Sequence, residues 1–287
     1  MSPRQRDLFL RLGAAVVATL VLAPPLGAVL DTVPFHRVMT RVFLGALVIA
    51  FLVKRGHPRT WPGKLRAMGL AGPDRLRRFL AGLAASILLT VLLLAVSWAL
   101  GARTGAAPFV EPSPLGLHLL KAALAAVLIS FLEEILCRGY FLDVLGGASS
   151  ALIYAVAHFI QPLHGSAPAD GFDPLLGVKR VAELLGSFHD ARNLTLGILS
   201  LFVFGLALNR LRERTGTLYL GIGLHAGLVF VLDLYPRFLT SHPGAEAAWI
   251  HGGGRLHDGV LGTLMLGLLL LAAHRLPLPA FCTRRNT

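Results

Sequence analysis

Charged residues are scarce in this sequence. Only 15% of its 287 residues are Asp, Glu, Lys or Arg, whereas 55% are hydrophobic, and the mean hydropathy is +0.68. A soluble domain of this size would not carry so much apolar surface. The shortage of charge therefore excludes an ordinary soluble protein and predicts an all-α, polytopic bundle of membrane helices.

Cysteines and metal-binding motifs are also scarce. The two cysteines, Cys137 and Cys282, both fall near expected cytoplasmic ends, so we expect no disulfide between them. The sequence contains neither a CxxC nor an HExxH pattern, and it has no internal repeat or low-complexity tail. We therefore interpret the histidines of the two longer loops as ordinary loop residues, with no metal site. They are His164, His189, His242, His251 and His257.

Acidic residues are outnumbered, with 15 Asp and Glu against 27 Lys and Arg, which gives a formal net charge of +12. The basic residues lie in short stretches between apolar runs. This is the pattern of cytoplasmic loops that face a lipid bilayer, not of a surface that binds nucleic acid. With the N-terminus inside, 18 of the 27 basic residues fall in inside segments. Both termini are therefore predicted to be cytoplasmic.

Apolar runs of near-membrane length predict about eight transmembrane helices. Some are shorter than the usual ~20 residues, so tilted or partly buried helices are expected among them. The first run follows Arg4, Arg6 and Arg11 and contains Pro24 and Pro25. Because no clear cleavage site follows it, we interpret it as an uncleaved span and not as a signal peptide. The expected spans are 12–30, 40–53, 79–100, 115–137, 148–163, 194–210, 216–234 and 259–274.

The chain divides into three expected sections. Residues 1–114 hold the N-terminal spans and a basic cytoplasmic segment at 54–78, which is predicted to anchor at the membrane interface. Residues 115–234 form a core that carries the unusual polar residues. Residues 235–287 hold an external loop, the last span and a cytoplasmic tail.

Two glutamates and an arginine occur at the end of the apolar run that begins near Leu115. A charge at bilayer depth costs about 3 kcal/mol on insertion scales, so three charges within six residues need a reason. Glu134 and Arg138 are i and i+4 and share a helix face, which predicts a structural ion pair. Glu133 lies about 100° around the helix from Glu134, so it does not share the face of the ion pair. We interpret Glu133 as the functional carboxylate. The alternative is a span that ends before Glu133, in interfacial water.

Two later spans each carry a histidine. Tyr154 and His158 are i and i+4 on one face of the expected fifth span. His225 lies about nine residues, or roughly 13 Å, into the expected seventh span, so it should be deep. Gly221 and Gly227 beside it favour close helix packing. Alternatively, each histidine serves only a structural role, with its ring bonded to water or to a backbone carbonyl.

One carboxylate and two imidazoles on three separate spans form a set with catalytic potential. Such a set can position a water and abstract its proton, or it can bind a metal with one open coordination site. Either use suits the hydrolysis of a peptide bond in a cavity that is open to water. The same residue types also build proton relays in transporters, but the sequence shows no inverted repeat or pair of broken helices.

Three motifs over about 115–230 resemble those of the CPBP family of intramembrane proteases, also called the CAAX-protease/bacteriocin-processing or Abi family. They are Glu133-Glu134-x-x-x-Arg138, an aromatic-x-x-x-His motif that ends at His158, and a glycine-rich segment with His225-Ala. The eukaryotic prenyl-protein endopeptidase that trims CaaX proteins belongs to this family. The resemblance implies a multi-pass membrane endopeptidase, here expected in a bacterial inner membrane, that cleaves a membrane-associated protein or peptide.

The resemblance also implies a role for each motif. Glu133 and His158 would activate a water, and His225 would stabilise the oxyanion that forms. Glu134, Arg138 and Tyr154 would support them. The family's older description is metal-dependent, but we adopt the glutamate-protease mechanism, which uses no metal, and keep a zinc-dependent version as an alternative.

The sequence departs from the family pattern at two positions. Tyr154 stands where Phe is usual, which keeps the ring. Val229 stands where Asn is usual, and valine cannot donate a hydrogen bond. Asp233 lies roughly 12 Å beyond His225 along the axis and cannot replace that amide, whereas Asn209, at the end of the sixth span, is a candidate donor from a neighbouring helix. The missing amide leaves open a non-catalytic scaffold or immunity protein with the same fold.

Overall fold

The structure is a computed structural model of the whole chain. It describes residues 2–29, 35–52, 61–105, 115–158, 173–179, 191–241, 248–252, 256 and 258–275. The chain forms two compact units: one comprises Met1–Pro58 and His158–Asp190, and the other Arg59–Ala157 and Ala191–Thr287. Among the loop histidines, His164, His189, His242 and His257 lie outside the described residues, as does Cys282.

The first unit contains two long helices that pack against each other, α1 (Pro3–Val29) and α2 (Phe35–Leu52). Gly27, near the end of α1, meets the ring of Phe35 at the start of α2. Toward the other end, Arg11 pairs with Asp7 at 2.9 Å and also donates to the carbonyl of Ala50. These contacts make an antiparallel helical hairpin, in which α1 continues through its two prolines.

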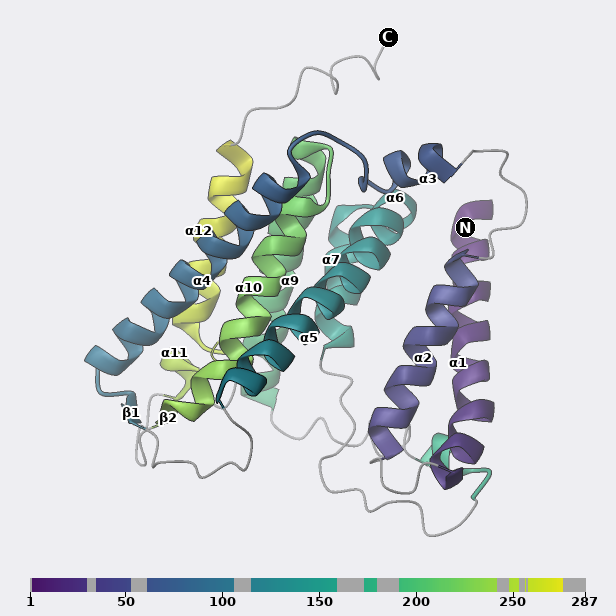
Figure 1. The fold of residues 1–287 in the computed structure, drawn as a ribbon, viewed down its shortest axis with the longest axis horizontal. Coiled ribbons are helices and arrows are strands. Elements are labelled where there is room, and N and C mark those ends of the chain that lie inside the picture. Colours follow the sequence, from purple (N-terminus) through teal and green to yellow (C-terminus); the bar gives the residue numbers. More distant parts are fainter. Residues whose placement is uncertain are drawn as a thin grey trace. The chain divides into compact units, whose positions relative to one another are not determined.

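The second unit is a helical bundle with α10 (Tyr219–Leu234) packed between α4 (Arg75–Ala99) and α5 (Leu115–Leu136) (Figure 1). Helix α9 (Ala191–Thr215) packs on α7 (Gly147–Ala157) and α12 (Val260–Arg275). The described residues of this unit also form the short helices α3 (Trp61–Ala67), α6 (Leu142–Leu145) and α11 (Ala248–His251), and a 3-10 turn at Tyr235–Arg237.

Glycines set the close approach of α4 and α10. A Cβ atom added to Gly223 would overlap the backbone carbonyl of Phe79, and one added to Gly82 would overlap that of Leu220. A Cβ on Gly227 would lie 2.7 Å from the carbonyl oxygen of Leu83. In a membrane, where lipid is as apolar as the helix surface, small residues let helices associate through backbone packing. The close crossing fixes α10, and with it the histidine at its centre.

The described residues contain five helices long and apolar enough to cross a membrane. They are Pro3–Val29, Arg75–Ala99, Leu115–Leu145, Thr195–Thr215 and Tyr219–Arg237. Two shorter apolar helices, Gly147–Ala157 and Val260–Arg275, occupy other expected spans. The prediction of an all-α membrane bundle is confirmed, whereas the expected count of eight spans is not established.

Two short strands, which the sequence analysis did not predict, join segments distant in the chain. Strand β1 (Arg103–Gly105) pairs antiparallel with β2 (Leu239–Ser241). The Arg103 guanidinium donates to the carbonyl of Gly252 at 3.1 Å and lies 5.4 Å from the ring centroid of Tyr235. The ends of α4 and α10 are thus tied together on one side of the bundle.

Candidate active site

Glu134 and Arg138 form the predicted ion pair, and both side chains are buried. Nη1 of Arg138 donates to Oε1 of Glu134 at 2.9 Å. Arg138 also donates from Nε to Asn209 at 3.2 Å and from Nη2 to the carbonyl of Gly205 at 3.4 Å. A buried guanidinium is tolerated only when its charge and its N–H groups find partners, and here several do. Helix α5 continues past Glu133, and the Glu134–Arg138 pair is buried among other side chains.

Arg138 stands in a π-helical turn, Cys137–Phe141, that continues α5 into α6. Such turns are rare and are frequently found at functional sites. The carbonyl of Cys137 accepts from the backbone N–H of Leu142 and also from the hydroxyl of Ser150 at 2.9 Å. The wide turn is thereby braced against α7, where the second motif begins.

Glu134 also contacts His225, a contact that the sequence analysis did not predict. Nδ1 of His225 lies 3.1 Å from Oε1 of Glu134, the same oxygen that accepts from Arg138. An ionised carboxylate can only accept hydrogen bonds, so Nδ1 carries a proton. In the neutral ring, Nε2 is then the unprotonated nitrogen. Glu134 therefore sets both the position and the tautomer of His225.

Nε2 of His225 faces the remaining polar groups. The hydroxyl of Tyr154 lies 3.4 Å from it, and Oε2 of Glu133 lies 3.8 Å from it. Unlike Glu134, whose side chain is 1% exposed, Glu133 is 29% exposed. The two adjacent glutamates thus have different surroundings: Glu134 is buried in the predicted ion pair, whereas the Glu133 side chain is partly exposed and lies near His225.

Aromatic rings hold the His225 imidazole in place. Its centroid lies 5.8 Å from that of Tyr154 and 5.8 Å from that of Phe204, and both contacts are edge-to-face. His225 itself is 2% exposed. The sequence analysis missed Phe204, because a phenylalanine in an apolar helix carries no local sign of a special role.

His158 directly follows Ala157, the last residue of α7, one helical turn after Tyr154. Side-chain ligand atoms of Glu133, His158 and His225 all lie within 4.8 Å of one another. The structure therefore brings together the three residues that the sequence analysis selected.

Asn209 serves a different neighbour from the one considered for it in the sequence. Its side-chain amide donates to the carbonyl of Gly147 at 2.7 Å, while its oxygen accepts from Arg138. The residue thus braces the ion pair against the start of α7, and we do not assign it to an oxyanion. Asp233, near the end of α10, lies 3.5 Å from His118 on a partly exposed surface.

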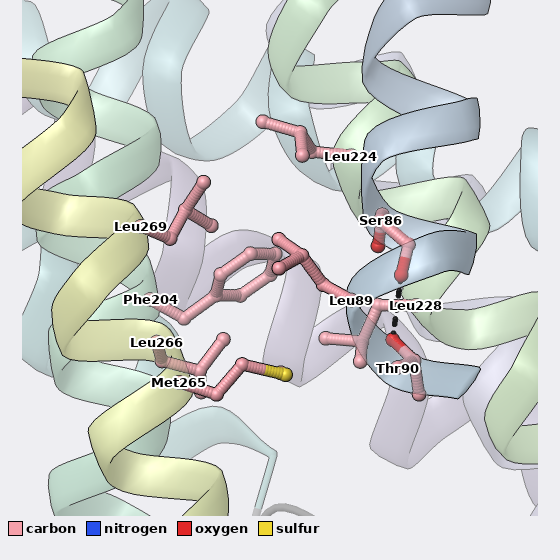
Figure 2. Close-up of a pocket in the computed structure, with 9 residues that line it drawn as sticks. All are labelled: Ser86, Leu89, Thr90, Phe204, Leu224, Leu228, Met265, Leu266 and Leu269. Carbon is pink, nitrogen blue, oxygen red and sulfur yellow. Dashed lines mark hydrogen bonds between the residues drawn. The ribbon is translucent and has the colours of Figure 1, made fainter. Parts of the chain in front are cut away.

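A small cavity lies beside this cluster, lined by residues of α4, α9, α10 and α12 (Figure 2). Its volume is about 10 Å³, enough for about one water molecule. Phe204 lines it, and on its wall the hydroxyl of Thr90 donates to the carbonyl of Ser86 at 2.8 Å. No ionisable side chain lines this cavity, so it is not where chemistry would occur.

Ionisable side chains buried together in a membrane bundle are costly and are kept for function, which places the protein in the class of polytopic membrane enzymes and transporters. Residues 115–231 match the sequence model of a family described as type II CAAX prenyl endopeptidase Rce1-like. This stretch matches the CAAX-protease (CPBP) family, as the motifs indicated, and the match supports an intramembrane endopeptidase in general. Searches of curated proteins and of solved structures find no match.

Proposed function

We propose that this protein hydrolyses a peptide bond near the membrane surface with a water that Glu133 and His158 activate. The observation that carries the proposal is the convergence of Glu133, His158 and His225, whose side-chain ligand atoms lie within 4.8 Å of one another. Glu133 comes from α5, His158 from the turn that follows α7, and His225 from α10, all within the matched domain. A carboxylate and an imidazole that converge in this way can position a water and take its proton.

In this mechanism Glu133 is the general base. Its carboxylate takes a proton from the water that His158 orients, as the water oxygen forms a bond to the scissile carbonyl carbon. The carbonyl oxygen becomes an oxyanion, to which His225 donates from Nε2 when its ring is protonated. The carbon–nitrogen bond then breaks, and the proton passes from Glu133 to the leaving amine. The products are a carboxyl group and an amine, which balances the hydrolysis.

A zinc-dependent version of the reaction uses the same residues. Two imidazole nitrogens and one carboxylate form the donor set of thermolysin-like zinc sites, which leave one position open. The Glu134 carboxylate on Nδ1 of His225 is the partner that a metal-bound histidine usually has. Zinc, when bound, would polarise the carbonyl and lower the pKa of a bound water.

Metal analysis and chelation separate the two versions. With the purified protein in detergent, we expect far less than one zinc per chain and activity that survives 1,10-phenanthroline. Activity that phenanthroline abolishes and added Zn²⁺ restores would establish the zinc-dependent version instead.

The description of the matched family, which names CAAX prenyl endopeptidases, supports a proposal for the substrate class. We propose a membrane-associated protein or peptide as substrate, with the enzyme in a bacterial inner membrane and both termini in the cytoplasm. A reporter enzyme fused after Thr287 should be active only on the cytoplasmic side. An external signal would reverse the proposed orientation.

Two substitutions test the proposed activity. Glu133→Gln and His158→Ala should each abolish cleavage of an internally quenched, farnesylated CaaX peptide, and both should remove the same new termini from membrane proteins of expressing cells. Glu213→Gln is the matched control, because Glu213 pairs with Arg210 on the surface. Unchanged cleavage in both assays would refute the mechanism. A cellular phenotype that Glu133→Gln preserves would favour the non-catalytic scaffold, which the valine at position 229 already makes a specific alternative.

A further inference from the structure

A buried hydroxyl lies beside the outward nitrogen of His225. Tyr154 is 2% exposed, and its hydroxyl oxygen lies 3.4 Å from Nε2 of His225. Oε2 of Glu133, the proposed base, lies 3.8 Å from the same nitrogen. The Tyr154 hydroxyl and the Glu133 carboxylate therefore both lie near Nε2 of His225. In the proposed mechanism the scissile carbonyl of the substrate binds at this point.

The ring of Tyr154 is held so that its hydroxyl keeps this direction. The Arg138 guanidinium lies 4.3 Å from the ring centroid. The rings of Phe204 and His225 pack around it, with centroid separations of 6.4 and 5.8 Å. A donor whose position is fixed before the reaction costs no reorganisation when charge develops.

Few other side chains near this point can donate while the His225 ring is neutral. Nδ1 of His225 is engaged by Glu134, so Nε2 donates to the oxyanion, as in the proposed mechanism, only when the ring is protonated. The side chain of Asn209 bonds to Arg138 and to the carbonyl of Gly147. Val229, one turn beyond His225, has no polar atom. A phenol stays protonated at neutral pH and can donate.

From this arrangement we infer that the Tyr154 hydroxyl donates a hydrogen bond to the oxyanion of the tetrahedral intermediate. The inference deepens the proposed function and rests on it. The phenol keeps its proton throughout: its hydrogen bond moves from Nε2 of His225 to the oxyanion, and returns when the carbon–nitrogen bond breaks. Tyr154 is thus a catalytic residue as well as a packing residue.

Tyr154→Phe removes the hydroxyl and keeps the ring contacts, so the variant should fold. Loss of one oxyanion donor lowers kcat by roughly 10²–10³-fold. We expect that loss with the farnesylated CaaX peptide, at a nearly unchanged KM. Tyr219→Phe is the matched control, because it removes a hydroxyl that donates to the carbonyl of Leu70 at 3.1 Å, away from the cluster. It should leave kcat within about twofold of the parent.

A second variant distinguishes catalysis from packing. Val229 and His225 share a helix face, so Val229→Asn offers a new donor beside the reacting carbonyl. In the Tyr154→Phe background it should raise kcat at least tenfold, which repair of packing alone would not do. If Tyr154→Phe folds poorly, as judged by size-exclusion chromatography, 3-fluorotyrosine at position 154 takes its place. Its more acidic hydroxyl should raise kcat at constant KM.

The outcomes separate this inference from the proposed function. If Glu133→Gln abolishes cleavage while Tyr154→Phe, or 3-fluorotyrosine in its place, leaves kcat within twofold, the oxyanion role is refuted and the endopeptidase proposal stands. If Glu133→Gln also leaves cleavage unchanged, the proposed function itself fails.

Discussion

Glu134 and His225 are joined by a direct contact of 3.1 Å between Oε1 and Nδ1, although 91 positions separate them in the chain. Both side chains are almost completely buried. The contact links the ion pair of α5 to the histidine of α10 through one carboxylate. Removal of that carboxylate should therefore affect stability and catalysis together.

We expect Glu134→Gln to destabilise the protein by about 3–5 kcal/mol, because it leaves the buried guanidinium of Arg138 without its carboxylate. The apparent free energy of unfolding in mixed micelles measures this loss. Glu213→Gln, at the surface pair with Arg210, should change it by less than about 1 kcal/mol. Equal effects of the two substitutions would contradict a structural role for the buried pair.

Gly223→Ala should prevent α4 and α10 from reaching their observed separation. The new Cβ would overlap the carbonyl of Phe79, a backbone atom that cannot rotate away. We expect a sharp fall in the yield of folded, monodisperse protein. Gly267→Ala, in α12, is the matched control, since nothing lies within 4 Å of a Cβ there. It should be neutral or stabilising by up to about 1 kcal/mol, because alanine favours a helix more than glycine does. A folded Gly223→Ala with unchanged thermal stability would show that the crossing is not tight.

Phe204→Ala should open a space between the small cavity and the His225 ring. Truncation of a buried Phe typically costs about 3–5 kcal/mol. Phe204 is 1% exposed. Because the imidazole also loses an edge-to-face neighbour, kcat should fall more than the remaining folded fraction explains. Phe238→Ala, at a side chain that is 54% exposed, should leave both quantities almost unchanged. If the two substitutions cost the same, Phe204 does not hold the ring.

Local spacing predicted those features of the site that lie within one helix. The i, i+4 relation of Glu134 and Arg138 gave their ion pair, which is confirmed. The separation of the two glutamates by about 100° around the helix also left Glu133 for a partner other than Arg138, and its carboxylate lies near His225. The contact between Glu134 and His225 could not follow from spacing, because it depends on how α5 and α10 pack.

The features of the fold that the sequence did not predict also depend on packing or on backbone geometry that leaves no local pattern. Pairing of β1 with β2 joins segments 136 residues apart at Thr104 and Thr240, in connections where no apolar periodicity exists to indicate a strand. The π-helical turn was missed because its sequence, Cys137–Phe141, contains no proline or other signal that separates it from an α-helix. The roles of Glu133, His158 and His225 in catalysis remain predictions.

The π-helical turn at Cys137–Phe141 has a consequence for comparing relatives. A turn of this kind holds one more residue than the α-helix it interrupts, and one residue corresponds to about 100° of rotation. Loss of a single residue there would swing α6 and the entry to α7 around the axis, carrying the tyrosine and histidine of the second motif away from the first. Natural insertions and deletions should therefore avoid this stretch, and family members should keep a constant number of residues between the arginine and the aromatic.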